Sequence, residues 1–585
     1  MQRGDKNVGT EMNAVLRPEF PRPDFVRNEW SPLNGIWQFS FDQPVFDRSI
    51  TVPFCYQSTM STIGETEDHD VVWYRREFLV EAERLTGKRL LLKFGAVDSE
   101  ASVWINGVYA GGHTGGYTSF ELDITELVKE GINEVTVKAV DDTNSDKPRG
   151  KQTWTGEKFG CWYTPITGIW QSVWLEYAGA CYLKRVKATP QLSDLTALCE
   201  VFVSCDEEVK AEVTAYLENG NVFLCRQTIP CRHGYGKLSL AFPDYDIRRG
   251  ELLWTPEEPN LITLIVKITG KDGCADEVAA YFGMRSIEWE NGIISLNGSP
   301  YYQRLVLDQG YWPESILTPP SDEAIQEDIR LTKAMGFNGA RKHQKIEDPR
   351  YYYWADKMGL LVWGELPSAY EFNDNAMEAS SRELMEFVKR DYNHPCIVTW
   401  VPVNESWGVR SIRGNLQQQN YCRMLTYLLK AMDPVRLVSA NDGWEQVSDT
   451  DICALHDYAL FPQTEKKYDD MGNVLKTYCE SRRLFAEGNS YQGQPVILTE
   501  YGGIAFEGDG AEGSWGYYGR VKDEEQFLGI LEPITEFLIR SGHFNGFCYT
   551  QLTDVMQEVN GLLTEDRKPK VSIERLHDVF AKRIY

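Results

Sequence analysis

The sequence predicts a three-part chain: two antiparallel β-sandwiches followed by a (β/α)8 TIM barrel. First, the chain has 585 residues, about four domains at ~150 residues each, which excludes a single small module. Second, up to about residue 285 short runs alternate apolar and polar residues, with Gly and Asn between them. Third, beyond about residue 290 short apolar runs alternate with helical segments. We place the domains at 1–180, 181–286 and 287–585.

The first two segments carry the strand signals. Alternating runs at 87–107, 133–140 and 168–177 predict an antiparallel sandwich of the jelly-roll type. The next ~105 residues repeat the pattern at lower aromatic density, which suits one immunoglobulin-like sandwich. Its strand candidates are LCEVFVSC (198–205), AEVTAYLE (211–218) and LITLIVKITG (261–270).

The last segment contains eight apolar strand candidates, most of them separated by a helical stretch. The candidates are 300–307, 337–343, 359–366, 396–405, 436–442, 452–458, 495–501 and 544–552. One predicted helix, 321–336, begins with Ser321 as an N-cap and ends at Gly336. Eight such strands over ~290 residues indicate a (β/α)8 barrel. A doubly wound sheet is the alternative, but no GxGxxG follows a strand.

Composition narrows the functional classes. The formal net charge is −26, which argues against general binding to nucleic acid or to an anionic membrane. Residues 1–25 contain no apolar signal-peptide core, and no run of ~18 apolar residues predicts a membrane-spanning helix. The 13 cysteines show no metal-binding spacing, so we interpret most of them as reduced thiols of a cytoplasmic protein.

Polar residues follow the end of every predicted barrel strand, where barrels of this kind place their active sites. These residues are Asp308, His343, Glu365, Asn404 with Glu405, Asn441 with Asp442, His456 with Tyr458, Glu500 and Gln551. Apolar strands lead directly into Glu405 and Glu500, which are 95 positions apart. A barrel interior can bring two such carboxylates within the ~5–5.5 Å that a retaining glycosidase requires.

Several motifs make the whole chain similar to glycoside hydrolase family 2, the family of β-galactosidases, β-glucuronidases and β-mannosidases. VPVNESWG (401–408) resembles its Asn-Glu acid/base signature, and ILTEYGG (497–503) resembles its nucleophile strand. WYRREF (73–78) and PRGKQTW (148–154) resemble its sugar-binding jelly roll. FGMRSIE (282–288) resembles the junction into its barrel. The resemblance therefore covers all three segments.

The resemblance implies roles for individual residues. Glu405 would be the acid/base and Glu500 the nucleophile, and Asn404 would hydrogen-bond the sugar 2-hydroxyl. Tyr458 matches a tyrosine that holds the nucleophile, and His343 and Glu365 match site residues after strands two and three. Each also has a structural interpretation. Tyr458 and His343 would then be buried core residues, and Glu365 would only orient other side chains.

Three departures from the family pattern bear on specificity. EVNGLL (558–563) lacks the lysine of the Asn-x-Lys-Gly motif found in family glucuronidases. Strand eight, CYTQLTD (548–554), lacks an aromatic floor, so Gln551 is expected to bind the sugar and Trp407 or Trp444 to stack on it. Strand one ends RLVLDQG (304–310), where Asp308 is a candidate for sugar hydroxyls.

A basic group beside His343 offers a further route to an acidic sugar. Arg341, Lys342 and Lys345 could bind a carboxylate, although we favour a solvated loop cluster. The Gly-rich stretch 507–520, after strand seven, is either a wall over the site or an ordinary loop.

These observations favour an exo-acting retaining β-glycosidase of the β-galactosidase type acting on a small glycoside or oligosaccharide. A β-hexuronidase (a β-galacturonidase or an atypical β-glucuronidase) and an arabinosidase are alternatives in the same family. A non-catalytic carbohydrate-binding protein is the alternative from another class. We predict no cofactor and no metal, because no HExxH occurs and His343 and His456 have no partners at metal-ligand spacing. The resemblance leaves a homo-oligomer open.

Overall fold

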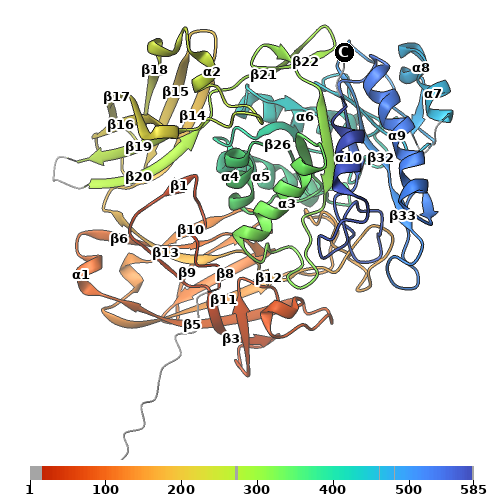
Figure 1. Cartoon of the computed structure of the whole chain (residues 1–585). Coiled ribbons are helices and arrows are strands. Elements are labelled where there is room, and N and C mark those ends of the chain that lie inside the picture. Colours follow the sequence, from red (N-terminus) through yellow and green to blue (C-terminus); the bar gives the residue numbers. More distant parts are fainter. Residues whose placement is uncertain (1–15, 271–274, 460–461, 480, 583–585) are drawn as a thin grey trace, which may run out of the picture.

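The computed structural model describes residues 16–270, 275–459, 462–479 and 481–582 (Figure 1). Two sandwiches, red to orange and yellow to light green, lie beside a barrel that runs from green to blue. The predicted boundaries fall between β13 (Val173–Gly179) and β14 (Leu183–Gln191), and between β20 (Ala275–Phe282) and β21 (Ile287–Glu290). Residues 1–15, part of the stretch for which we predict no signal peptide, lie outside the described residues.

The N-terminal sandwich consists mainly of two antiparallel sheets, in the orders β10-β6-β13-β2 and β4-β3-β5-β11-β8-β9. Its other elements are β2 (Trp30–Pro32), β3 (Gly35–Phe41), β4 (Arg48–Val52), η1 (Thr59–Ser61), β5 (Val71–Val80), α1 (Ala82–Leu85), β6 (Lys88–Phe94), β7 (Val97–Asp98), β8 (Glu100–Ile105), β9 (Val108–Thr114), β10 (Phe120–Asp123), η2 (Thr125–Leu127), β11 (Gly131–Val140) and β12 (Gly168–Ile169). Alternate residues of β11 are buried, as the period-two pattern predicts. Short β1 (Phe25–Val26) instead pairs with β20 of the second sandwich.

The central sandwich pairs a sheet in the order β1-β20-β19-β16-β17 with a sheet in the order β14-β15-β18. Its remaining elements are β15 (Thr196–Val203), β16 (Val209–Leu217), η3 (Asn219–Asn221), β17 (Val222–Cys231), β18 (Tyr235–Ala241), η4 (Pro243–Tyr245), α2 (Arg249–Leu252) and β19 (Ile262–Thr269). All three predicted strands are present, as β15, β16 and β19. The buried residues of both sheets form one apolar core.

All eight predicted barrel strands form one parallel sheet in the order β28-β27-β26-β25-β24-β35-β32-β29. They are β24 (Gln303–Asp308), β25 (Gly339–Lys342), β26 (Leu361–Glu365), β27 (Ile397–Val401), β28 (Leu437–Val438), β29 (Cys453–His456), β32 (Val496–Gly502) and β35 (Gly546–Thr550). This is the circular neighbour order of a (β/α)8 barrel, opened between strands five and six. The Gln446 side chain bridges towards strand six there, because its amide bonds both the N–H and the C=O of Ala454.

Most of the strands are followed by helices, as predicted. The helices are α3 (Asp322–Ala334), α4 (Pro349–Met358), α5 (Asp374–Asp391), α6 (Leu416–Met432), α7 (Gln463–Lys467), α8 (Met471–Leu475), α9 (Glu524–Arg540) and α10 (Ile573–Phe580). Short strands accompany them: β22 (Ile293–Leu296), β23 (Ser299–Pro300), β30 (Tyr478–Cys479), β31 (Arg482–Arg483), β33 (Ile504–Phe506) and β34 (Gly519–Val521). Ser321 caps α3 by accepting from the Ala324 N–H, as predicted. Residues 439–452, all described, contain no helix, so strand five reaches strand six through a loop.

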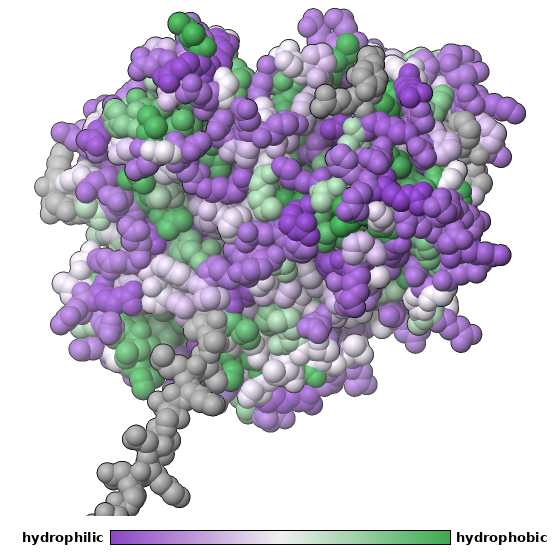
Figure 2. Space-filling view, in the orientation of Figure 1, coloured by the Kyte–Doolittle hydropathy of each residue, from purple (hydrophilic) through white to green (hydrophobic). Residues whose placement is uncertain are grey.

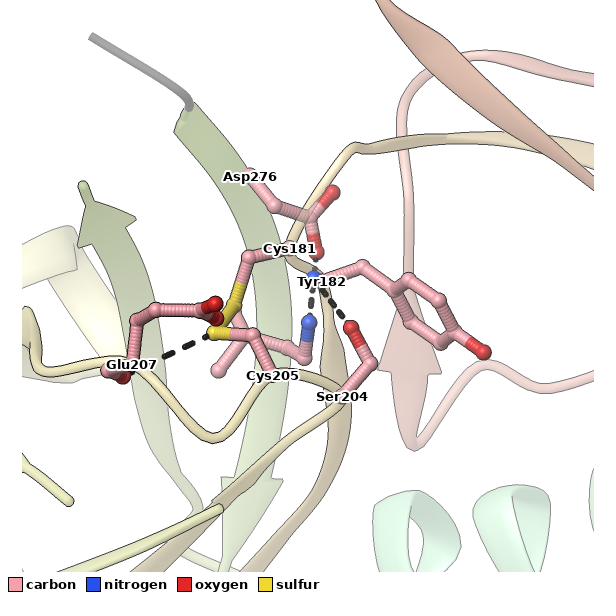
Figure 3. Close-up of a disulfide and its surroundings, with 7 residues drawn as sticks. Cys181, Tyr182, Ser204, Cys205, Glu207 and Asp276 are labelled. Atoms are coloured by element: carbon pink, nitrogen blue, oxygen red, sulfur yellow. Dashed lines mark hydrogen bonds between the residues drawn. A yellow bond between two sulfur atoms is a disulfide. The ribbon is translucent and has the colours of Figure 1, made fainter. Parts of the chain in front are cut away.

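One cysteine pair departs from the expectation of reduced thiols. Cys181 and Cys205 form a disulfide between the start of the central sandwich and the residues after β15 (Figure 3). Beside it, the Tyr182 N–H donates to Ser204 Oγ at 2.9 Å. Buried Cys199 and Cys231 in the same domain are free thiols. A thiol count without a spacing motif could not indicate this pair, because it joins residues that only the strand pairing brings together.

The molecular surface is largely hydrophilic on the face shown in Figure 2, with apolar side chains in scattered groups. This agrees with the composition and the strongly negative net charge. Within the described part of the chain, none of the helices has both the length and the apolar character needed to cross a membrane.

Candidate active site

Glu405 and Glu500 approach each other at the carboxyl ends of the barrel strands. Glu405 lies four residues beyond β27, whereas Glu500 lies within β32, five places away in the sheet order. One carboxylate oxygen of each lies within 4.8 Å of the other and of a ring nitrogen of His456. The Glu405 side chain is 22% exposed and that of Glu500 only 4%. The two predicted catalytic carboxylates are therefore a close pair, of which Glu405 is the more accessible.

The backbone at Glu405 is held in an uncommon conformation. Glu405 and Ser406 have φ of 49° and 57°, a left-handed region that costs a non-glycine residue free energy. Two contacts hold it there. The Glu405 N–H donates to the Asp442 carbonyl at 2.8 Å, and the Ser406 N–H donates to Asn441 Oδ1 at 3.0 Å. Trp407 Nε1 then donates to Glu405 Oε2 at 3.2 Å, so the loop fixes the carboxylate as well.

Arg341, on β25, is the central cation of the site and is completely buried. It donates to Glu365 Oε2 at 2.8 Å and to Glu500 Oε1 at 3.2 Å. It also donates to Asn404 Oδ1 at 2.6 Å and lies 3.2 Å from Asp442 Oδ1. Although burial acts to lower it, the pKa of Arg341 is raised by these carboxylates. Burial in turn raises the pKa of Glu365 to about 7, despite the neighbouring Arg341.

Tyr458 contacts the carboxylate on β32. Its hydroxyl donates to Glu500 Oε2 at 2.7 Å, and Thr550 Oγ1 lies 3.3 Å from the same hydroxyl. The Tyr458 ring stacks on Tyr517 at a centroid distance of 4.0 Å. Because Arg341 takes the other oxygen, both oxygens of Glu500 are oriented by fixed donors.

A chain of hydrogen bonds runs from Asn404 across the site. Since Asn404 Oδ1 accepts from the arginine, its Nδ2 donates to His343 Nε2 at 3.2 Å. His343 Nδ1 then donates to Gln309 Oε1 at 3.0 Å, and Gln309 Nε2 donates to Gln551 Oε1 at 2.9 Å. Gln551 completes the chain by donating to Asn560 at 3.1 Å. Burial, with nearby cations, holds the pKa of His343 well below its usual value, so this ring is neutral.

The basic group after strand two is not a solvated cluster, contrary to our expectation. Lys342 and Lys345 are each no more than 1% exposed. Lys342 Nζ bonds Asp308 and Glu347, both at 2.8 Å, and lies over the ring of Tyr351 on α4. Lys345 bonds backbone carbonyls and Glu347, and burial lowers its pKa to about 8. These lysines are paired within the protein rather than presented to a ligand.

Asp308 belongs to this lysine cluster and not to the acidic pair. Its second oxygen accepts from the Gly310 N–H at 2.8 Å. Asp308 and Lys342 are register partners on adjacent parallel strands, so their side chains point the same way, towards α4. The geometry therefore does not support the predicted contact between Asp308 and a sugar hydroxyl, because the Asp308 carboxylate already accepts from Lys342 and the Gly310 N–H.

The N-terminal sandwich contributes a loop to the site. Gly150 has φ of 60°, and a Cβ there would lie 2.2 Å from the Gln344 carbonyl, so only glycine permits the loop to dock on the barrel. The next residue, Lys151, is 7% exposed. Although burial acts to lower it, the pKa of Lys151 is raised by Cys161 and Glu558, with Glu405 contributing.

The stretch after strand seven closes onto the same loop. Trp515 Nε1 donates to the Gly160 carbonyl at 3.1 Å. Beside it, Gln557, which follows strand eight, donates through Nε2 to the Trp162 carbonyl at 2.8 Å. Trp162 also meets Trp407 edge to face at 5.0 Å. Residues 507–520 thus form a wall fastened to the N-terminal sandwich. Of the two predicted stacking residues, Trp407 is partly exposed, whereas Trp444 is buried against His456.

Two groups of side chains in the described part of the chain have the spacing of metal ligands. They are Glu65 with Glu67 and His69, and Glu405 with His456 and Glu500. In the second group, His456 Nδ1 lies 2.8 Å from Glu405 Oε1 and its Nε2 lies 2.8 Å from Asp442 Oδ1. A metal would need an unprotonated ring nitrogen, whereas the neighbouring carboxylates raise the pKa of His456 to about 10. With a carboxylate oxygen facing each of its nitrogens, the ring is held as an imidazolium.

Sequence reasoning missed several members of this site. It identified His456 and Asp442 as strand-end residues without a role, and it assigned Arg341 to a surface cluster. Gln309 and Lys151 were not predicted at all, although Lys151 lies within the PRGKQTW motif. The available signal for Arg341 was its place inside a predicted barrel strand, 337–343, because a cation buried in a barrel requires carboxylate partners.

The fold and the acidic pair define a class of protein: a multidomain barrel built like the glycoside hydrolases. Three sequence models of one protein family match the chain. "Glycosyl hydrolases family 2, TIM barrel domain" matches residues 321–583, "sugar binding domain" of the same family matches 32–175, and "Glycosyl hydrolases family 2" matches 181–285. The chain belongs to glycosyl hydrolases family 2.

Individual relatives differ in length. A β-galactosidase of Thermoanaerobacter pseudethanolicus is 28% identical over 64% of this chain, and the chain spans 50% of that protein. The chain therefore covers only about half of several curated relatives. A β-glucuronidase of Paenibacillus borealis is 24% identical over 95% of this chain and 97% of its own length.

Solved structures of similar size share the fold. A family 2 β-galacturonidase from Eisenbergiella tayi, bound to galacturonate, has a TM-score of 0.76 at 21% identity, covering 98% of this chain and 100% of that one. A β-glucuronidase from an uncultured Clostridium has a TM-score of 0.76 at 21% identity, covering 96% and 99%.

Proposed function

We propose that this protein is an exo-acting retaining β-glycosidase. One observation carries the proposal: a carboxylate oxygen of Glu405 lies within 4.8 Å of one of Glu500. Retaining enzymes hold the two carboxyl groups at ~5–5.5 Å, whereas inverting enzymes need ~6.5–9.5 Å to admit a water between them. The wall of residues 507–520 against the N-terminal loop supports an exo mode, because it closes one side of the site to a long chain.

Each residue has a role in the proposed double displacement. Glu500, oriented by Tyr458 and Arg341, attacks the anomeric carbon while Glu405 delivers a proton to the departing oxygen. The bond to the aglycone breaks as the glycosyl ester forms. Glu405 then takes a proton from water, whose oxygen displaces Glu500 and releases the sugar with its configuration retained. Asn404 keeps one N–H free of the bond to His343, which suits the sugar 2-hydroxyl.

The terminal sugar we propose is a β-galactoside. The three cations at the end of strand two and just after it support a neutral sugar, because Arg341, Lys342 and Lys345 are all bound to protein carboxylates or carbonyls. A neutral ring needs hydrogen-bonding groups instead, and the amides of Gln309 and Gln551 each use one of their two N–H groups in the hydrogen-bond chain, which leaves the second for a sugar hydroxyl. The β-galactosidases among the curated relatives also favour this assignment.

A β-hexuronide is the second candidate, and Lys151 is the observation that favours it. This buried cation, contributed by the N-terminal loop, lies close enough to Glu405 for the two charges to interact. A sugar carboxylate could take the place of Glu558 as its counterion. The relatives that match this chain over nearly their whole length are named β-glucuronidase or β-galacturonidase.

The test is hydrolysis of a panel of p-nitrophenyl glycosides by the parent protein, with Glu500→Gln as the blank. The panel contains the β-galactoside, β-glucoside, β-mannoside, β-glucuronide, β-galacturonide and α-L-arabinosides. We expect turnover of the β-galactoside that is abolished in the variant. Turnover that survives in Glu500→Gln would overturn the nucleophile assignment.

Lys151→Met separates the two sugars. If the substrate is a neutral galactoside, the variant changes kcat/KM by less than about tenfold, since no sugar charge is lost. If the substrate is a hexuronide, the variant loses about 10²-fold or more, the usual cost of removing one partner from a desolvated charge pair. Sugar binding without any hydrolysis over hours would instead support the carbohydrate-binding alternative.

A further inference from the structure

His456 occupies an unusual position between acidic side chains. It ends β29 and is 1% exposed. Its Nδ1 lies 2.8 Å from Glu405 Oε1 and 3.5 Å from Glu500 Oε1, whereas its Nε2 lies 2.8 Å from Asp442 Oδ1. The preceding loop passes tightly over the ring, because a Cβ at Gly443 would lie 2.8 Å from Nδ1.

Both ring nitrogens therefore face carboxylate oxygens. The other charged group against the ring is Arg341, whose Nη1 lies 3.4 Å from Nε2 and itself bonds to Glu500. Although burial acts to lower it, the pKa of His456 is raised to about 10 by Glu500, Asp442 and Glu405. Burial acts to raise the pKa of Asp442, but Arg341 and His456 hold it at about 2. At neutral pH the ring thus carries a proton on each nitrogen.

Glu405 does not itself hold the proton that a general acid must deliver. Burial acts to raise the pKa of Glu405, yet its hydrogen bond and charge interaction with His456 hold it below the ordinary value. Glu405 is consequently a carboxylate when the site is empty of substrate. A general acid must nevertheless bring a proton to the leaving oxygen.

We propose that His456 stores the proton that Glu405 delivers to the leaving group. The inference rests on the proposed function of Glu405 as acid/base. In the first half-reaction, the Nδ1 proton passes to Glu405, and Glu405 passes it to the glycosidic oxygen as the bond to the sugar breaks. His456 is left neutral, with Nε2–H still bonded to Asp442. In the second half-reaction, Glu405 takes a proton from the attacking water and returns it to Nδ1.

The nucleophile drives this transfer in the correct direction. Glu500 is the largest of the charges that stabilise the imidazolium. When Glu500 becomes an ester, its negative charge disappears and the imidazolium holds its proton less firmly. Proton release to the leaving oxygen is thereby promoted in the step that consumes the charge. When water frees Glu500 again, the restored charge favours the return of the proton.

The experiment compares His456→Asn with the parent on aryl β-glycosides whose leaving groups range from dinitrophenol to phenol. Asparagine keeps a donor near Glu405 but has no proton to give. For the phenyl glycoside we expect kcat/KM to fall by about 10²-fold or more, the usual size of general-acid assistance. For the dinitrophenyl glycoside, which departs without protonation, we expect a change of less than about fivefold.

The pH profile gives an independent readout. In the parent, the alkaline limb of kcat/KM for the phenyl glycoside follows loss of the stored proton, near pH 10. In His456→Asn that proton is absent, so Glu405 must hold its own and the alkaline limb moves to lower pH by several units. An unshifted limb, or an equal loss on both substrates, would show a merely structural role and overturn the proposal.

His394 provides the matched control. It is a second buried histidine, bonded to Asp356 at 2.6 Å, and it precedes β27 at the opposite end of the barrel from Glu405. His394→Asn should not alter the ratio of the phenyl to the dinitrophenyl rates. If it alters the ratio as His456→Asn does, the effect is one of stability and the proposal fails.

Two measurements remain decisive if His456→Asn does not fold. In the ¹⁵N spectrum of the parent protein near neutral pH, both ring nitrogens of His456 should be protonated, with the signal assigned by its change in Glu405→Gln. A neutral ring would overturn the proposal. Dialysis against EDTA should leave turnover unchanged, whereas a loss restored by a divalent metal would make Nδ1 a ligand and overturn it too. Failure of the proposed function is distinct, because Glu500→Gln would then retain the turnover of the parent.

Discussion

Arg341 and Lys342 are consecutive residues of β25, and both are fully buried cations among carboxylates. Because successive side chains of a strand point to opposite faces, Arg341 faces the barrel interior and Lys342 faces α4. Arg341 bonds Glu500, which belongs to the acidic pair. Lys342 bonds Asp308 and Glu347, which contact only other parts of the scaffold in the described bonds.

The difference shows what separates a functional ion cluster from a structural one. In the lysine cluster every described carboxylate is paired on the helix side, so its charges serve to satisfy one another. In the arginine cluster the network extends through Asp442 and His456 to Glu405, whose side chain remains 22% exposed. Burial and charge are alike in the two clusters. Access of a ligand to one carboxylate distinguishes them.

The largest expected effect is on catalysis, from Arg341→Lys. A lysine retains the charge but lacks the planar guanidinium fork, whose separate nitrogens reach Glu365, Glu500 and Asn404, so Glu500 and Asn404 lose their orientation. We expect kcat/KM to fall by about 10³-fold, the scale reported for removing a preorganised donor from an active site. Steady-state kinetics on the substrate found with the glycoside panel provide the measurement, with circular dichroism to verify the fold. Activity within about tenfold of the parent would contradict the central role of Arg341.

The second expected effect is on stability, from Lys342→Met. This change leaves Asp308 and Glu347 buried with one cation fewer, at a cost of about 3–5 kcal/mol of unfolding free energy. Below its unfolding temperature the variant should keep kcat within about threefold of the parent. Urea unfolding and kinetics on the folded protein measure the two quantities.

Asp308→Asn, combined with Lys342→Met, is the control for that experiment. Removing both charges should restore part of the lost stability, because the uncompensated carboxylate disappears. A loss of kcat/KM beyond about 10²-fold in the folded double variant would place Asp308 in the substrate site after all. The distinction between the two clusters would then fail.

The smallest expected effect is a pH dependence of stability that belongs to the arginine cluster. Burial raises the pKa of Glu365 to about 7, so between its ordinary value and pH 7 the folded protein holds a proton that the unfolded chain has released. Stability therefore falls as pH rises through this window, by up to about 1.4 kcal/mol per pH unit for one proton. Glu365→Gln should remove that slope. Urea midpoints at about pH 5 and about pH 7 measure it, and an unchanged slope would contradict the assignment.

Much of the architecture could be predicted from local patterns. The period-two runs identified sandwich strands such as β11 and β16, and the eight apolar runs correspond to the eight barrel strands. Capping chemistry predicted the start of α3 at Ser321. These features depend on neighbours a few residues apart, where the sequence itself carries the information.

Other features depend on contacts between residues that are far apart in the sequence. Nothing local to β25 distinguished Arg341 from Lys342, and the docking of Gly150 on Gln344 joins two domains. The disulfide between Cys181 and Cys205 and the hydrogen-bond chain from Asn404 to Gln551 likewise join segments separated in sequence. These contacts could be identified only from the folded structure.

By itself, the sequence determined the three domains, the strands of the barrel and the strand-end positions of Glu405 and Glu500. Only the tertiary structure decided that Arg341 faces the acidic pair, that Asp308 faces α4, and that His456 lies between three carboxylates. The physical reason is the range of the forces involved. Hydrophobic periodicity and capping act over a few residues, whereas the protonation and pairing of a buried charge depend on every group that folding brings within a few ångströms.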